Sequence, residues 1–335
     1  MNSQADGRIW LLRLVLPGRW GRWLTSLLIF SCMFLLLGSG GVWTDVLPEA
    51  ARASRGTSLF FCVILAYIIP IFHFICERSQ SALCALTPVL DLEVEQIALR
   101  EAALVHKSRR WSLMVLSIGF LAGIAHSALL RSAVSATPTP STIGPAVVTV
   151  ISTVAIWLVM TTVIAALVHN ASLFAHLSKN LKFDLLNTHA LKPFATVAVI
   201  STLAMIGAQA AFPLMLMEGE ISALTYLPGL VATAGPMLLM LFLPIWPVHR
   251  LLAAKKRKTL DDLTRQIVNA PQLTDDQQTA LAVLNPLLAF RREIMQVPEW
   301  PFDVGLLARL LLYLILPPLT WVGAALVENL VDSVL

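Results

Sequence analysis

Two polar side chains inside otherwise apolar stretches are the best candidates for chemistry in this sequence. His126 lies in GFLAGIAHSALLR, and Gln209 lies in IGAQAAFPL. A histidine in such a place could relay protons or bind a ligand, or it could stay neutral and donate a hydrogen bond to another helix. The small residues around His126 favour the second, structural interpretation. Gln209 has the same two interpretations.

A weaker candidate is the set His73, Cys76 and Glu77 in IFHFICER. These residues share one side of a helix because they are three and four positions apart. They could begin a transition-metal site, but ligands from elsewhere in the chain would have to complete it. Their place at the end of an apolar run favours a histidine that is hydrogen-bonded at the membrane boundary. We therefore expect no metal and no other cofactor.

Motifs of the familiar enzymes are absent. The sequence contains no GxxxxGK[ST], GxGxxG, GxSxG or HExxH, which disfavours the common phosphate-binding, dinucleotide-binding, acyl-transfer and zinc-protease activities. No paired acid and base stands out, so we do not expect an enzyme. The four cysteines show no CxxC spacing, and we expect them to be free thiols.

The elements that must position these residues are apolar runs. Of the 335 residues, 57% are hydrophobic and only 13% are charged, against about 25% charged in soluble domains. Runs near 20 residues can cross a bilayer as helices. The sequence therefore predicts an all-α polytopic helical bundle with about seven transmembrane helices, or six if the last segment is re-entrant. The runs are 24–43, 58–76, 112–131, 146–168, 194–217, 227–247 and 304–327.

The distribution of Lys and Arg predicts the orientation. The segments 1–22, 77–111, 169–193 and 248–303 carry 20 of the 24 Lys and Arg residues. By the positive-inside rule they are cytoplasmic, which predicts an inner (plasma) membrane protein with a cytoplasmic N-terminus and an external C-terminus. This basic side is expected to contact anionic lipid headgroups and to offer a surface to a cytoplasmic protein partner. Nucleic-acid binding is not expected, because no recognition motif accompanies the charge.

The chain divides into three regions on this interpretation. Residues 1–247 form a transmembrane bundle with a cytoplasmic N-terminal lead-in and a cytoplasmic amphipathic helix over 87–110, which Thr87 and Pro88 begin. Residues 248–303 form a small cytoplasmic helical cap. Its first helix continues the sixth run, and its second starts at Thr274 and is interrupted at Pro286. Residues 304–335 form the last transmembrane helix and a tail.

The stretch EWPFD before the last run is typical of the start of a membrane helix. Trp300 is expected at headgroup depth, Asp303 can cap the first amides of the helix, and Arg309 can extend back toward the interface. Asp303 and Arg309 could instead pair as part of a site. The first interpretation accounts for more of these residues.

The C-terminal half resembles a family of uncharacterised prokaryotic integral membrane proteins. The resemblance covers about residues 180–335. Asn187 stands where the family pattern has a second acid. The resemblance implies a shared membrane architecture and assigns no functional residue. It is carried by KFDLLNTHALKPF (182–194), AAKKRKTLDDL (253–263), LLAFRREIMQVPEWPFD (287–303) and WVGAALVENLVD (321–332).

Two functions follow as expectations. The first is a non-enzymatic regulatory, sensing or scaffolding component, because the sizeable soluble surface is predicted to be cytoplasmic and basic. The alternative is a channel or transporter for an ion or small solute that uses His126 or Gln209.

Overall fold

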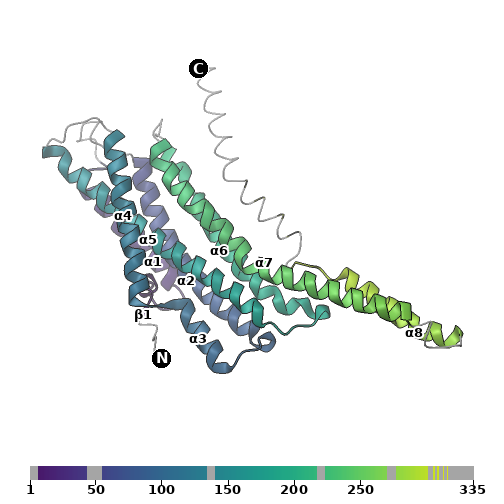
Figure 1. Cartoon of the computed structure of the whole chain (residues 1–335). Coiled ribbons are helices and arrows are strands. Elements are labelled where there is room, and N and C mark those ends of the chain that lie inside the picture. Colours follow the sequence, from purple (N-terminus) through teal and green to yellow (C-terminus); the bar gives the residue numbers. More distant parts are fainter. Residues whose placement is uncertain are drawn as a thin grey trace, which may run out of the picture.

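Long helices make up most of the part of the chain that the structure describes. The computed structural model describes residues 7–43, 55–133, 140–216, 223–269 and 277–300, and four single residues between 305 and 315. The helices pack side by side in a bundle, and the far half of α7 extends from it together with α8 (Figure 1). The α-helices are α1 (Gly21–Ser39), α2 (Arg55–Leu86), α3 (Val94–Val105), α4 (Arg109–Ala133), α5 (Pro140–Leu177), α6 (Lys192–Gln209), α7 (Ala223–Asn269) and α8 (Gln277–Gln296).

Six helical segments in the described residues are long and apolar enough to cross a membrane. They coincide with the first six predicted runs, so the prediction of a multi-pass helical membrane bundle is confirmed. The six segments are Gly21–Ser39, Arg55–Val89, Arg109–Leu129, Ala146–Asn180, Leu185–Met215 and Val231–Asn269.

The seventh predicted run lies almost entirely outside the described residues. Within 304–327 the structure describes Gly305, Ala308, Leu312 and Ile315, and all four are helical and exposed. The full count of seven crossings therefore stays a prediction.

Several helix ends differ from the limits of the apolar runs. The helices α2 and α5 reach about ten residues past the predicted ends at 76 and 168, because helical hydrogen bonding continues where hydropathy falls. In contrast, α6 ends at Gln209, before the predicted end at 217, and a short 3-10 helix, η6 (Phe212–Leu216), follows. Pro213 lacks the amide hydrogen that a continuing α-helix would need there.

Two glycines let α4 and α5 approach closely. A Cβ atom added to Gly123 would lie 2.8 Å from the Cα atom of Val154, and one added to Gly119 would lie 3.0 Å from the carbonyl oxygen of Trp157. Small residues at such positions allow membrane helices to pack backbone against backbone. The packing surface predicted for the small residues around His126 therefore faces α5.

The N-terminal lead-in is packed into one end of the bundle. Its strand β1 (Gly7–Arg8) pairs antiparallel with β2 (His106–Lys107), and the amide of Ile9 donates to the carbonyl of Val105 at 3.0 Å. Leu11 and Leu12, in the 3-10 helix η1 (Trp10–Arg13), are fully buried.

The loops after α2 and α5 meet at the same end. The amide of Asp91 donates to the carbonyl of Asn180 at 2.8 Å, and Lys182 forms an ion pair with Asp91 at 2.7 Å. Lys255 of α7 donates to the carbonyl of Phe183. All four segments predicted to share one side of the membrane thus come together, whereas the side that this end faces stays a prediction.

The amphipathic helix predicted over 87–110 is shorter than expected. Residues Thr87–Val89 form a 3-10 helix, η3, directly after α2, and α3 begins only at Val94. Pro88 therefore starts a single short turn, because α2 still occupies the chain up to Leu86. The apolar stripe of α3 is buried only at its C-terminal end, at Leu104 and Val105, while Val94 is exposed.

The predicted cap is an extended arm. The arm consists of α7 from Arg250 to Asn269 together with α8, which run along each other away from the bundle (Figure 1). Pro286 does not interrupt α8, which is continuous from Gln277 to Gln296. Proline frees one carbonyl, that of Ala282, and because Ala282 is exposed this carbonyl can be solvated. The predicted start at Thr274 lies outside the described residues.

Candidate functional site

A large cavity in the bundle is lined by residues of α2, α4, α5, α6, η6 and α7. Its volume is about 730 Å³, within the range of roughly 300–1,000 Å³ that is usual for small-molecule sites. Phe60 and Ile64 of α2 and Phe212 and Met215 of η6 line it, and the rings of Phe60 and Phe212 are in contact, with centroids 5.1 Å apart.

The cavity is elongated along α5. This helix lines it from Thr153 to Ser172, and the 19 steps between these two residues correspond to about 28 Å at 1.5 Å per step. That length is close to the thickness of the hydrocarbon core of a bilayer, about 30 Å. The shape therefore suits a chain-like molecule better than a compact one.

The lining is apolar and carries no formal charge. Among the described residues around the cavity there is no Asp, Glu, Lys or Arg. The polar groups are the hydroxyls of Ser and Thr residues, the indole N–H of Trp157 and two histidines, His126 and His169. A few polar groups in an apolar wall can orient a ligand, but they cannot replace the hydration shell of an ion along the whole length.

His126 of α4 lines the cavity and is bonded to α5. The indole Nε1–H of Trp157 donates to Nδ1 of His126 at 2.9 Å, and the two rings meet edge to face with centroids 5.8 Å apart. The predicted hydrogen bond to another helix therefore exists, but His126 accepts it instead of donating it. An acceptor at Nδ1 fixes the neutral tautomer that carries its proton on Nε2.

Gln209 of α6 is buried beside the same cavity without lining it. Its side-chain amide donates to Oγ1 of Thr233 at 3.3 Å, and Thr233 of α7 lines the cavity. The structure thus brings both polar residues of the sequence prediction to one cavity. Trp157 and Thr233 are the hydrogen-bond partners of His126 and Gln209. The sequence did not predict them, because no local pattern indicates which residue of another helix will face a given side chain.

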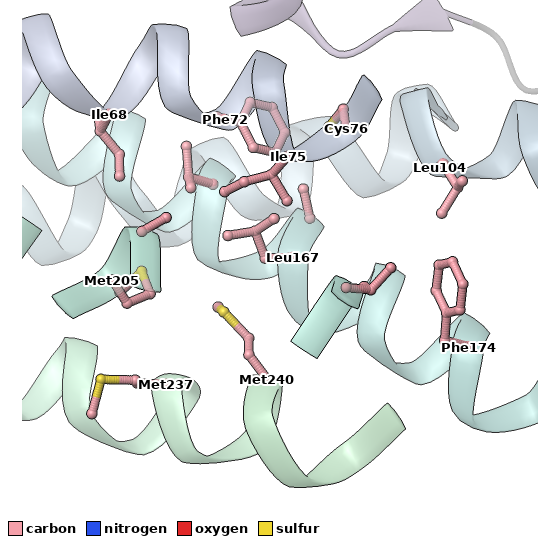
Figure 2. Close-up of a cluster of buried hydrophobic side chains, with 14 of the residues drawn as sticks. Ile68, Phe72, Ile75, Cys76, Leu104, Leu167, Phe174, Met205, Met237 and Met240 are labelled. Carbon is pink, nitrogen blue, oxygen red and sulfur yellow. The ribbon is translucent and has the colours of Figure 1, made fainter. Parts of the chain in front are cut away.

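The candidate set His73, Cys76 and Glu77 does not converge on one point. Cys76 lies in the apolar core with Ile68, Phe72 and Leu104 (Figure 2). Glu77 is half exposed and lies 3.5 Å from Nδ1 of His73 and 3.6 Å from Arg22. In the described part of the chain no group of three or more His, Cys, Asp and Glu residues could hold a metal ion.

All four cysteines are free, as expected. Cys62 and Cys76 are buried, whereas Cys32 and Cys84 are exposed.

Trp300 lies against α7. Its ring stacks on that of His249 at 4.0 Å, and His249 Nδ1 lies 2.9 Å from the carbonyl oxygen of Glu299. Lys256 donates to the carbonyl of Val297 at 2.8 Å. These contacts fasten the end of α8 to α7. Asp303 and Arg309, the other members of the predicted helix start, lie outside the described residues.

No protein-family model matches this chain, and neither a curated protein nor a solved structure is significantly similar to it. The resemblance of the C-terminal half to a family of membrane proteins therefore stays a prediction.

Proposed function

We propose that the protein is a non-enzymatic sensing or regulatory component of the inner membrane, with its N-terminus in the cytoplasm. It binds an apolar or amphipathic small molecule in the bundle cavity. The arm formed by α7 and α8 communicates the occupied state to a protein partner or to the lipid headgroups of the cytoplasmic face.

The continuity of α7 is the observation that carries this proposal. Ala232 and Thr233 line the cavity, and the same helix runs without a break to Asn269 in the arm. The 36 steps from Thr233 to Asn269 span about 54 Å at the α-helical rise. A change at the cavity wall can therefore reach the arm through one continuous helix.

Three prolines lie in this part of α7 and give it places to bend. Pro236, Pro244 and Pro247 each remove a backbone hydrogen bond from the helix. Helices kink at such positions, so ligand contacts near Thr233 can alter the angle of the arm. Beyond them, the basic stretch 255–258 supports contact with anionic headgroups or an acidic partner surface.

The lining of the cavity disfavours the alternative of an ion channel. A hydrated ion needs charged side chains or a continuous series of oxygen atoms, and the described lining has neither. A transporter of an apolar solute would use the same cavity and differs from a sensor in letting the solute pass.

The proposal is tested by native mass spectrometry of the purified full-length protein released from mild detergent. We expect a bound small molecule that is lost in Ala165→Trp, because Ala165 lines the cavity and the indole would obstruct it at that point. Ala155→Trp is the matched control, since Ala155 is half-buried on the same helix but outside the lining. It should keep the molecule.

Two results would overturn the proposal. An equal ligand content in wild type, Ala165→Trp and Ala155→Trp would show that the cavity is not the binding site. A solute flux into liposomes that His126→Ala abolishes would make the protein a transporter.

A further inference from the structure

Aromatic rings from α2, α4, α5 and η6 line one end of the cavity. The ring centroids of Phe60 and Phe212 are 5.1 Å apart, and those of His126 and Trp157 are 5.8 Å apart. The ring of Phe61 lies 6.0 Å from that of Phe60. We call the part of the cavity that these five residues line the aromatic end.

The course of the helices places these rings at the same end. The loops that follow α2 and α5 are hydrogen-bonded to each other, so the two helices run in the same direction. Phe60 lies in the second turn of α2, and Trp157 lies four positions after Thr153, where the lining of α5 begins. Both are therefore far from the loops, whereas the lining ends at Ser172, toward the loops.

The end toward Ser172 differs in character. Aliphatic side chains predominate there, and the lining of α2 stops at Ile64. A surface of this kind suits a hydrocarbon chain, because it offers many dispersion contacts and few polar groups. Beyond Thr161 the lining of α5 consists of Ile164, Ala165, Val168, His169 and Ser172.

The aromatic end suits a flat ring. Aromatic rings attract one another in offset or edge-to-face arrangements with centroids about 4.5–7 Å apart. Met160 and Met215 also line the cavity, and thioether sulfur makes favourable contacts with ring edges. A planar ring on the ligand would gain these contacts, whereas a saturated ring of the same size would not.

The charge of the lining indicates an uncharged ligand. The described lining has no Asp, Glu, Lys or Arg, and a charged group without a countercharge is costly to bury. Hydroxyl groups are present, and each can donate to or accept from an uncharged oxygen. A ring carbonyl or ring hydroxyl is therefore accommodated better than a carboxylate or a phosphate. The threonines in the lining are Thr57, Thr153, Thr161 and Thr233.

We propose that the cavity binds an uncharged lipid of the quinone or quinol class, a planar oxygen-bearing ring on a long hydrocarbon chain. The ring lies at the aromatic end, and the chain runs along α5 toward Ser172. This inference rests on the proposed function, because it names the class of molecule that the cavity takes. Thr233 of α7 lines the cavity and is bonded to Gln209, three residues before Phe212, so the ring lies near the helix that carries the arm.

The test is competition binding to the full-length protein in nanodiscs. The tracer is a quinone with a photoreactive group at the end of its chain. The competitors share one chain length and are a fully substituted alkyl benzoquinone, the diketone with the same ring saturated, and an alkyl benzoate. Full substitution prevents addition of the free cysteine thiols to the quinone ring.

The competitors separate planarity from charge. The diketone keeps both oxygens but is not planar, so the quinone should bind at least about fivefold more tightly, which corresponds to about 1 kcal/mol. The benzoate is planar but charged, and it should bind at least about tenfold more weakly than the quinone, because its charge would be buried without a partner.

One variant removes a ring from the aromatic end. Phe212→Leu keeps an apolar side chain in the lining, and it should lower the preference for the quinone over the diketone at least about twofold. Phe120→Leu is the matched control, because Phe120 is an exposed ring of α4 outside the lining. It should keep the preference of wild type.

A measurement on wild type covers the case in which Phe212→Leu does not fold. Mass spectrometry locates the residues labelled by two quinone tracers, one with the photoreactive group beside the ring and one with it at the end of the chain. The first should label α2 and η6 near Phe60 and Phe212, and the second should label α5 near Ser172. The reverse pattern would contradict the proposed orientation.

The other outcomes overturn defined parts of the proposal. Equal affinities for the quinone and the diketone would remove the planar ring and leave the proposed function standing. A benzoate that competes as well as the quinone would show that the ligand need not be uncharged. If neither tracer labels the cavity and no competitor binds, the proposed function itself fails.

Discussion

At the scale of single residues, the environment of Lys107 makes stability depend on pH. Burial holds its pKa at about 8, below the ordinary value of 10.5. Between these values the unfolded chain binds more protons than the folded one, so stability rises with pH in this window and is constant below it. The difference corresponds to about 3 kcal/mol, at 1.36 kcal/mol per pH unit.

Lys107→Met is expected to remove this dependence. We predict that the Tm of wild type in detergent, measured relative to that of Lys107→Met, rises between pH 8 and 10.5 and does not change between pH 6 and 8. Comparing the two proteins cancels the titration of all other groups. Parallel curves across the whole range would mean that Lys107 titrates as an exposed lysine.

At the scale of elements, the contact between α4 and α5 depends on the absence of a side chain at Gly123. Gly123→Leu should destabilise the protein by at least about 1–3 kcal/mol, the usual cost of overpacking, because its Cβ would lie 2.8 Å from the backbone of Val154. Thermal unfolding in detergent would measure this. Ala125→Leu, at an exposed position of the same helix, should leave the Tm unchanged.

The contact between α8 and α7 also depends on a single side chain, that of Lys256. Lys256 is 14% exposed, bonds to the carbonyl of Val297 and lies 3.7 Å from Glu299. Lys256→Met removes both contacts, so we expect chymotrypsin to cut α8, which contains Phe290, faster than in wild type. Lys258→Met changes an exposed lysine in the same basic stretch and should not alter the cleavage rate. Equal rates in all three proteins would show that other contacts hold α8.

At the scale of the whole molecule, the distribution of charge predicts the orientation in the membrane. With 20 of 24 Lys and Arg residues in the segments predicted to be cytoplasmic, seven crossings would place the C-terminus outside. A periplasm-active reporter fused after Leu335 should therefore be active. An inactive reporter, together with an active cytoplasmic reporter at the same position, would mean six crossings and a re-entrant last segment.

The sequence by itself determined the class of the fold and the grouping of its loops. Apolar runs of bilayer length can be satisfied only as helices, because no water in the hydrocarbon core can bond to free backbone groups. Every second segment between the runs is rich in Lys and Arg, and the contact between Asp91 and Asn180 illustrates that these segments meet at one end. Helix ends were less predictable, since α2 continues to Leu86 after its apolar run has ended.

Only the tertiary structure decided what the polar residues do. The sequence singled out His126 and Gln209 as polar positions in apolar runs, but their partners, Trp157 and Thr233, come from other helices. Lys107 looked like one more basic residue near the end of the helix predicted over 87–110, and it is buried where its side chain bonds to Asn170 of α5. Burial and hydrogen bonding between distant segments depend on how the helices pack, and no local pattern of residues specifies that packing.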